Sequence, residues 1–266
     1  MISEESSPDA DQASRSWVVD PIDGTLNFSR GIPLYGLQAA FLKDGVPKAA
    51  AIYLPEYGEM FCASEEGAFL GESRIRTSHP RPLKECLVST GDFSRRSDAF
   101  RRAQAAVLSE CYGHVGRFKM FGAACTDFAF LACGRTDVHV RFTNRIWDYL
   151  PGLYIAEKAS AVYDKSLQRE EDVLLLCSSK EVLDEATEKI LPSIAKALRR
   201  RRLRFPPIIT RYARRASSWI LSLLPSTILN SISPVLSTSL TLSESERLRS
   251  KNVECICLMM SWPDSP

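Results

Sequence analysis

An apolar run that ends in two closely spaced carboxylates limits the folds open to this chain. Residues 17–19 are Trp, Val and Val, and the segment DPIDGT (residues 20–25) follows directly. The run predicts a short buried strand over residues 16–20, and the Pro and Gly residues predict a turn after it. Two carboxylates and a hydroxyl therefore gather at one strand end. Read as a bare hexamer, the segment is either a surface turn or an oxygen-ligand site for a cation.

The spacing of the two carboxylates suits a hard divalent cation. Asp20 and Asp23 lie three residues apart around a turn, and such a pair can hold one or two Mg²⁺ ions through oxygen. The turn can also direct the Ile22 carbonyl at a metal. The amides of Gly24 and Thr25 can bind a phosphate at a helix start, and the Thr25 hydroxyl can orient a water molecule. A calcium loop of the EF-hand kind fits badly, because the Asp spacing is wrong and no Glu closes the loop.

The pattern of the remaining chain predicts an α/β protein in three portions. Residues 1–82 hold the metal-site turn and an antiparallel meander with strands at 36–42, 48–53 and 59–64. A proline-containing linker at about 77–83 leads to an α/β portion, 83–198. Its predicted strands are 86–89, 137–141, 161–164 and 172–177, and its predicted helices are 97–111, 123–133, 148–159 and 180–198.

Charge separates a third portion, 199–266, from the rest. The net charge of the 266 residues is +2, which gives no reason to expect a nucleic-acid partner. Residues 199–266 hold eleven Lys or Arg against four Asp or Glu, so this stretch carries +7 and residues 1–198 carry −5. We expect a basic, Ser-rich, disordered tail. Its arginines and the uncharged segment Trp219–Leu242 predict at most weak association with a membrane surface.

Cysteine usage and the first residues bear on the compartment. The eight cysteines include no Cys-x-x-Cys, and several lie in apolar runs, as reduced core cysteines do. The first ten residues are polar and acidic, which is unlike a signal peptide. The sequence therefore predicts a cytoplasmic protein.

Two further acidic sites gain meaning only in combination. Asp148 follows Trp147 at a helix start, where it is either a helix N-cap or a ligand. The segment EES at residues 4–6 is by itself an acidic terminus. Together with WVVDPIDGTLNF and with GAACTDFAFLACGRTDVH at residues 122–139, these segments resemble the inositol monophosphatase family over about residues 2–198.

That resemblance implies a layered α/β (α+β) sandwich, apparently without the family's N-terminal helices. It also implies magnesium-dependent, lithium-sensitive hydrolysis of a small phosphate monoester, inositol monophosphate or a related sugar or polyol phosphate, and a homodimer. The implied metal ligands are Glu4, Asp20, the Ile22 carbonyl, Asp23 and Asp148. Catalytic roles fall on Glu4, Asp23 and Thr25. The residues implied to border the substrate are Asp23, Gly24, Thr25, Gly122, Ala123 and Asp148, with Trp147 packed behind the site.

The chain departs from the family pattern at three places, one of which is the short segment after Asp164, with Ala159 and Ser160 in place of the family's usual glycines. Arg141 stands where inositol-type members carry an acidic residue, and Ala123 replaces a common hydroxyl residue. The chain also begins close to Glu4, so this ligand is expected on a free terminus, where chains fray. Two hypotheses follow: an active phosphatase, or a truncated non-catalytic relative that acts as a binding or interaction protein.

Overall fold

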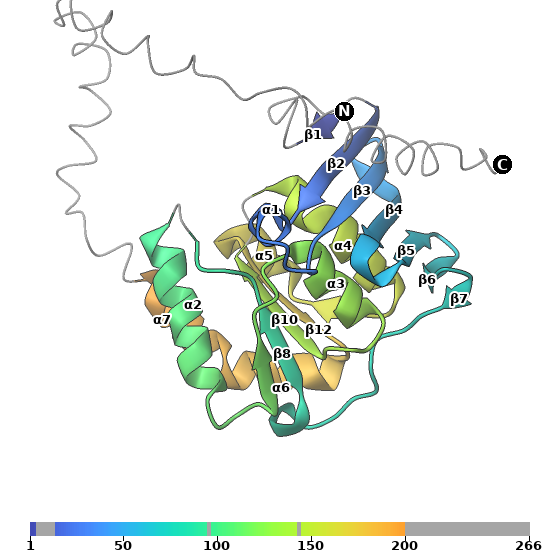
Figure 1. Cartoon of the computed structure of the whole chain (residues 1–266). Coiled ribbons are helices and arrows are strands. Elements are labelled where there is room, and N and C mark those ends of the chain that lie inside the picture. The colour runs from blue at the N-terminus through green and yellow to red at the C-terminus, as the bar shows by residue number, and fades with distance from the viewer. Residues whose placement is uncertain (4–13, 95–96, 143–144, 200–266) are drawn as a thin grey trace, which may run out of the picture. The chain divides into compact units, whose positions relative to one another are not determined.

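Two β-sheets organise the chain, for which the computed structural model describes residues 1–3, 14–94, 97–142 and 145–199. The first sheet has the strand order β1-β2-β3-β4-β5-β6-β7, and the second has the order β11-β12-β10-β8-β9 (Figure 1). The first sheet comprises β1 (Ile2–Ser3), β2 (Arg15–Asp23), β3 (Gly36–Lys43), β4 (Val46–Leu54), β5 (Glu59–Ser64), β6 (Gly67–Leu70) and β7 (Ser73–Arg74). The second comprises β8 (Leu87–Thr90), β9 (Arg117–Lys119), β10 (Val138–Phe142), β11 (Val162–Tyr163) and β12 (Val173–Cys177).

The first sheet confirms the predicted antiparallel meander and extends it. Strands β2 to β7 pair antiparallel in chain order, and β1 joins the far edge parallel to β2. Alternate side chains of β2 to β6, such as Val18 and Phe61, point into one buried core. The sequence reading missed β1, β6 and β7, because strands of two to four residues give too short an alternation to recognise.

The second sheet is mixed. Strand β10 pairs parallel with β8 and antiparallel with β12. All five residues of β12 are buried, as expected for a strand covered on both faces. Its side chains divide between two cores: Leu174 and Leu176 face the first sheet, whereas Val173 and Leu175 face the opposite way.

Helices fill the space between the sheets and cover the far face of the second sheet. Helices α3 (Ala124–Ala132) and α4 (Ile146–Lys158) share one core with the first sheet and with one face of β12. Helices α2 (Asp98–Cys111), α6 (Lys180–Lys189) and α7 (Leu191–Arg199) share the other core. Two short helices, α1 (Thr25–Ser29) and α5 (Lys165–Glu171), complete the fold. The predicted layered α/β sandwich is therefore confirmed (Figure 1).

The single helix predicted over residues 180–198 is wrong in one respect, because the structure divides it in two. Helix α6 ends at Lys189, Ile190 lies between the helices, and α7 begins at Leu191. Pro192 supplies the reason. It has no amide hydrogen to continue the bonding of α6, but it is well tolerated in the first turn of a new helix.

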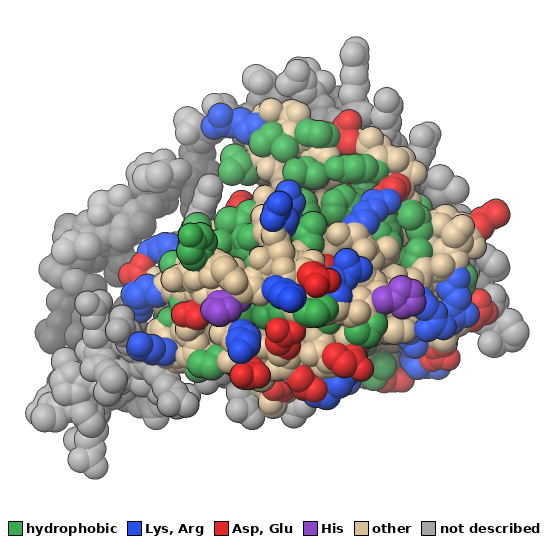
Figure 2. All heavy atoms as spheres, turned by 90° about the horizontal axis from the view of Figure 1, so that it is seen from below, with side chains coloured by type: hydrophobic (Ala, Val, Ile, Leu, Met, Phe, Trp, Pro, Cys, Tyr) green, Lys and Arg blue, Asp and Glu red, His purple; other side chains and the backbone are tan. Residues whose placement is uncertain are grey.

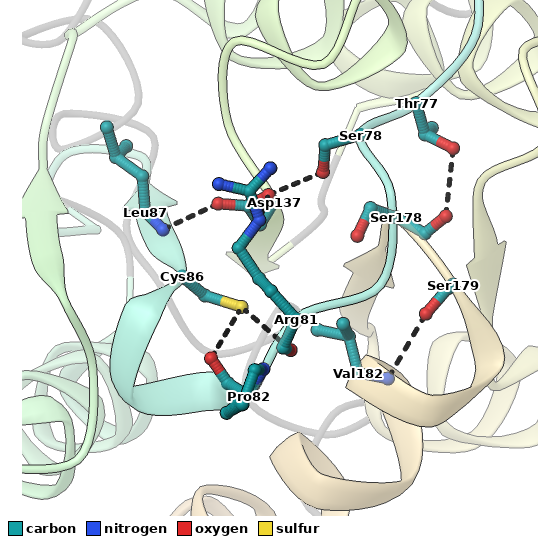
Figure 3. Close-up of polar contacts among 10 residues, drawn as sticks. All are labelled: Thr77, Ser78, Arg81, Pro82, Cys86, Leu87, Asp137, Ser178, Ser179 and Val182. Atoms are coloured by element: carbon teal, nitrogen blue, oxygen red, sulfur yellow. Dashed lines mark hydrogen bonds and ion pairs between the residues drawn. The ribbon is translucent and has the colours of Figure 1, made fainter.

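The predicted linker between the sheets is held by one buried carboxylate, Asp137. Its oxygens accept hydrogen bonds from the Ser78 hydroxyl at 2.5 Å and from the Leu87 amide at 2.7 Å. The Arg81 guanidinium lies 3.3 Å from the same carboxylate (Figure 3). Asp137 therefore joins the linker, the start of β8 and the approach to β10 at one point.

Within the described ranges, no helix is long and apolar enough to cross a membrane. The segment Trp219–Leu242, on which the membrane-surface prediction rested, lies outside them. The division at residue 83 and the basic tail stay predictions.

Candidate functional site

The DPIDGT segment lies where strand β2 leaves the first sheet. The structure extends β2 to Asp23, so Asp20 lies inside the strand and not at its end as predicted. The register with β3 slips between Asp20 and Asp23, which is a bulge at the rim of the sheet. Gly24 then adopts a left-handed conformation with φ 82° and is the N-cap residue of α1, which begins at Thr25. The bulge and the turn direct Asp23 toward helix α3.

Hydrogen bonds within the segment set its shape. The Ile22 amide donates to Asp20 Oδ1 at 3.2 Å, and the Thr25 hydroxyl donates to the Ile22 carbonyl at 3.0 Å. The Ile22 carbonyl, implied to be a metal ligand, therefore already accepts one hydrogen bond and keeps its second lone pair. The Thr25 hydroxyl, implied to orient water, is fixed at the same point.

Asp23 connects this segment to helix α3, 102 residues further along the chain. Its Oδ2 accepts a hydrogen bond from the Cys125 amide, at 2.5 Å, in the first turn of that helix. A carboxylate there balances the positive end of the helix dipole. Burial raises the pKa of Asp23, and the Cys125 bond and the Arg141 charge act against this rise. Nothing in the sequence indicated that Cys125 is its partner.

Two close approaches bring the implied phosphate-binding residues together. A Cβ at Gly24 would lie 2.8 Å from the Ala123 Cβ, so the turn packs directly on the start of α3. A Cβ at Gly122 would lie 3.0 Å from the Asn27 amide nitrogen. That amide also donates to the Phe121 carbonyl at 2.8 Å. Asn27, part of the recognised motif but given no role from the sequence, therefore links the two halves of the site.

Asp148 enters the site from helix α4, paired with Arg141. The helix begins at Ile146 after the cap residue Arg145, so Asp148 lies in the first turn and is not the N-cap. Arg141 Nη2 donates to Asp148 Oδ2 at 3.0 Å. The charge of Asp148 raises the pKa of Asp23, whereas that of Arg141 lowers it. The three charges are thus neighbours, contributed by β2, β10 and α4.

These groups fit Mg²⁺ only in part. Asp20 and Asp23 offer buried carboxylate oxygens, which are the donors Mg²⁺ prefers. Glu4 lies outside the described residues. Among the residues that are described, no three acidic, His or Cys side chains gather closely enough to hold a metal ion. In this arrangement the Asp148 carboxylate is engaged by a guanidinium.

A second buried group, next to the site, was not foreseen from the sequence. Asp127 and His139 are fully buried, and His139 Nδ1 lies 3.6 Å from Asp127 Oδ1 and 2.9 Å from the Ser89 hydroxyl. Burial raises the pKa of Asp127 well above its ordinary value and lowers the pKa of His139 to about 3. His139 is therefore neutral at pH 7, and burial favours the protonated form of Asp127. Each residue stands in an apolar run, which is typical of burial, but nothing in the sequence indicated that the two side chains meet.

Known proteins resemble this chain in sequence and in fold. The sequence model of the inositol monophosphatase family matches residues 1–202. The Nus factor SuhB of Xylella fastidiosa is 34% identical over 144 residues, which are 54% of this chain and 52% of that protein. The fructose-1,6-bisphosphatase/inositol-1-monophosphatase of Thermotoga maritima is 31% identical over 153 residues, 57% of each protein. This chain thus spans a little over half the length of the curated relatives it matches.

A solved structure supports the same assignment. The extragenic suppressor protein suhB from Bartonella henselae superposes with a TM-score of 0.62 and 27% identity, over 72% of this chain and 74% of that one.

Proposed function

Because the chain belongs to the inositol monophosphatase family, we propose that it hydrolyses a small phosphate monoester in the presence of Mg²⁺. Inositol monophosphate or a related polyol phosphate is the proposed substrate class. One observation carries this proposal: the buried Asp23 carboxylate accepts a hydrogen bond from the first turn of α3 and lies close enough to Asp148 to feel its charge. The name of the Thermotoga maritima relative, which joins inositol monophosphatase with fructose bisphosphatase, supports the substrate class.

The residues divide the work in a way that follows from their positions. When bound, Mg²⁺ neutralises phosphate charge and lowers the pKa of a coordinated water. Asp20 and Asp23 would hold it through carboxylate oxygens. Thr25, fixed by its bond to the Ile22 carbonyl, would orient the attacking water, and Gly24 lets the turn pack directly on the start of α3.

A sharp test is Asp23→Asn. The substitution removes one negative charge and almost no volume, so we expect phosphate release to fall by a factor of about 100 or more, as for loss of a group that acts on developing charge. The fold should persist, because the Asn carbonyl can still accept from the Cys125 amide. Asp44→Asn is the matched control, because Asp44 is exposed in the turn between β3 and β4. This variant should release phosphate at the rate of the parent chain.

Unchanged phosphate release in Asp23→Asn, measured on protein with a parent-like circular dichroism spectrum, would remove this site from the mechanism.

The second hypothesis, a non-catalytic relative that acts by binding, is favoured by a different observation. Arg141 already pairs with Asp148, a residue implied to be a metal ligand. This hypothesis predicts no phosphate release at any Mg²⁺ concentration from folded protein.

A further inference from the structure

The Arg141 side chain, on strand β10, is largely buried in the candidate site. Its Nε is fully buried, and no described residue accepts a hydrogen bond from it. Nη2 donates to Asp148, and Nη1 lies 3.5 Å from the position that a Cβ would take at Gly91. The side chain is only 15% exposed, so little of the guanidinium is in contact with solvent. The guanidinium therefore lies beside the Gly91 backbone, just after β8.

Carboxylates from three different elements surround this cation. Besides Asp148 on α4, Asp23 on β2 and Asp127 on α3 each have a pKa that the Arg141 charge lowers against the effect of burial. A guanidinium stays charged at every pH at which the protein folds. Arg141 therefore places a permanent positive charge on Asp148 and close to Asp23.

A divalent metal ion would have to share the Asp148 carboxylate with the Arg141 guanidinium. Asp148 Oδ2 is occupied by Arg141, and a divalent ion on the other oxygen would lie within a few ångströms of the guanidinium. Repulsion between such neighbouring charges is large at the effective dielectric of a protein interior.

We propose that Arg141 is a built-in cation that occupies Asp148 and keeps a divalent metal ion off this carboxylate. The inference rests on the proposed function, because it assumes that Asp20 and Asp23 form the metal-binding side of the same site. It follows that the chain binds metal at the Asp20–Asp23 side alone, and that Asp148 acts as the anchor of Arg141.

Metal binding tests this directly and needs no turnover. Mn²⁺ takes oxygen ligands as Mg²⁺ does and is counted by electron paramagnetic resonance. In Arg141→Gln we expect Mn²⁺ to bind at least about tenfold more tightly, or in greater number, because one neighbouring positive charge has gone. The double variant Arg141→Gln with Asp148→Asn should lose that gain, because the gain comes from the freed carboxylate.

Two controls separate this local effect from a general change of charge. Arg145→Gln removes a positive charge four residues away, from a guanidinium stacked 5.3 Å from the Trp147 ring, and should bind Mn²⁺ like the parent chain. Arg141→Lys keeps the charge and should also resemble the parent chain. If Arg141→Gln does not fold, Arg141→Met, which keeps most of the aliphatic stem, takes its place.

The outcomes distinguish this inference from the proposed function. Equal Mn²⁺ binding in the parent and in Arg141→Gln, or a gain that survives in the double variant, overturns the inference even if the parent hydrolyses phosphate esters. Tighter binding that depends on Asp148 sustains the inference even if the parent releases no phosphate.

Discussion

At the residue scale, the buried pair Asp127 and His139 makes the stability of the protein depend on pH. The folded pKa of His139 is lowered by burial to about 3, from an ordinary value of 6.5. Below pH 6.5 the unfolded chain therefore binds a proton that the folded chain does not. The stability that neutral His139 allows is present above pH 6.5 and is lost as the pH falls toward 3.

We predict that His139→Gln weakens this dependence. Between pH 6.5 and pH 5, a single such histidine lowers the free energy of unfolding by about 2 kcal/mol. Urea unfolding of both proteins at pH 7.5 and pH 5 measures the difference. Asp127, whose folded pKa is raised, acts with the opposite sign above its unfolded pKa, but it is present in both proteins and cancels. Equal losses on acidification would show that His139 is not the group responsible.

The chemical groups of the candidate site were easier to predict from the sequence than the contacts between them. Asp20, Asp23 and Thr25 stand in one short segment, so their proximity could be read from the sequence. The Cys125 amide that binds Asp23 could not, because it depends on how β2 meets α3. Arg141 was recognised as an unusual residue, but its bond to Asp148 required the packing of β10 against α4.

At the element scale, the contact between α3 and α4 depends on a glycine, whose lack of a side chain lets the two helices pack closely. Gly152 lies in the middle of α4, where a Cβ would overlap the ring of Phe128 on α3. Propensity alone favours Ala over Gly in a helix by about 1 kcal/mol. Packing reverses that preference here, because Phe128 is fully buried and cannot move aside.

Gly152→Ala should therefore destabilise the protein by about 2 kcal/mol, the usual cost of overpacking a core. Ala105→Gly on the exposed side of α2 is the control, and it should also destabilise, by about 1 kcal/mol, through propensity. Thermal unfolding of the two variants compares them. A gain in stability for Gly152→Ala would contradict the close packing of the two helices.

The position of the linker depends in the same way on one residue, Asp137. Asp137→Ala leaves the Leu87 amide without its partner, and loss of this buried network should cost about 3 kcal/mol. Asp184→Ala, which removes an exposed partner of Lys180 on α6, should change stability by less than about 0.5 kcal/mol. Chemical denaturation measures both. Similar small effects in the two variants would mean that Asp137 does not hold the linker.

The elements themselves were largely predictable because their hydrophobic periods are strong. Strand β5 and helix α2 agree with the sequence reading to within one residue. The break at Ile190 was missed because the apolar period continues across it, and only the Pro192 backbone interrupts the helix. Strand β9 was missed because it has only three residues, two of them exposed.

At the scale of the whole molecule, layering determines where the site lies. The first sheet supplies Asp20 and Asp23, the helical layer supplies Cys125 and Asp148, and the second sheet supplies Arg141. Family membership and the alternating layers were predictable from sequence, whereas the meeting point of three layers was not.

The face seen from below in Figure 2 mixes acidic and basic side chains.

The most direct test of the central proposal is phosphate release from myo-inositol 1-phosphate and a small panel of polyol phosphates, with Mg²⁺ and with a chelator. Turnover that requires Mg²⁺ and is lost in Asp23→Asn is the result that we predict. No release from folded, Mg²⁺-saturated protein, or release that persists in the chelator, would contradict the proposal.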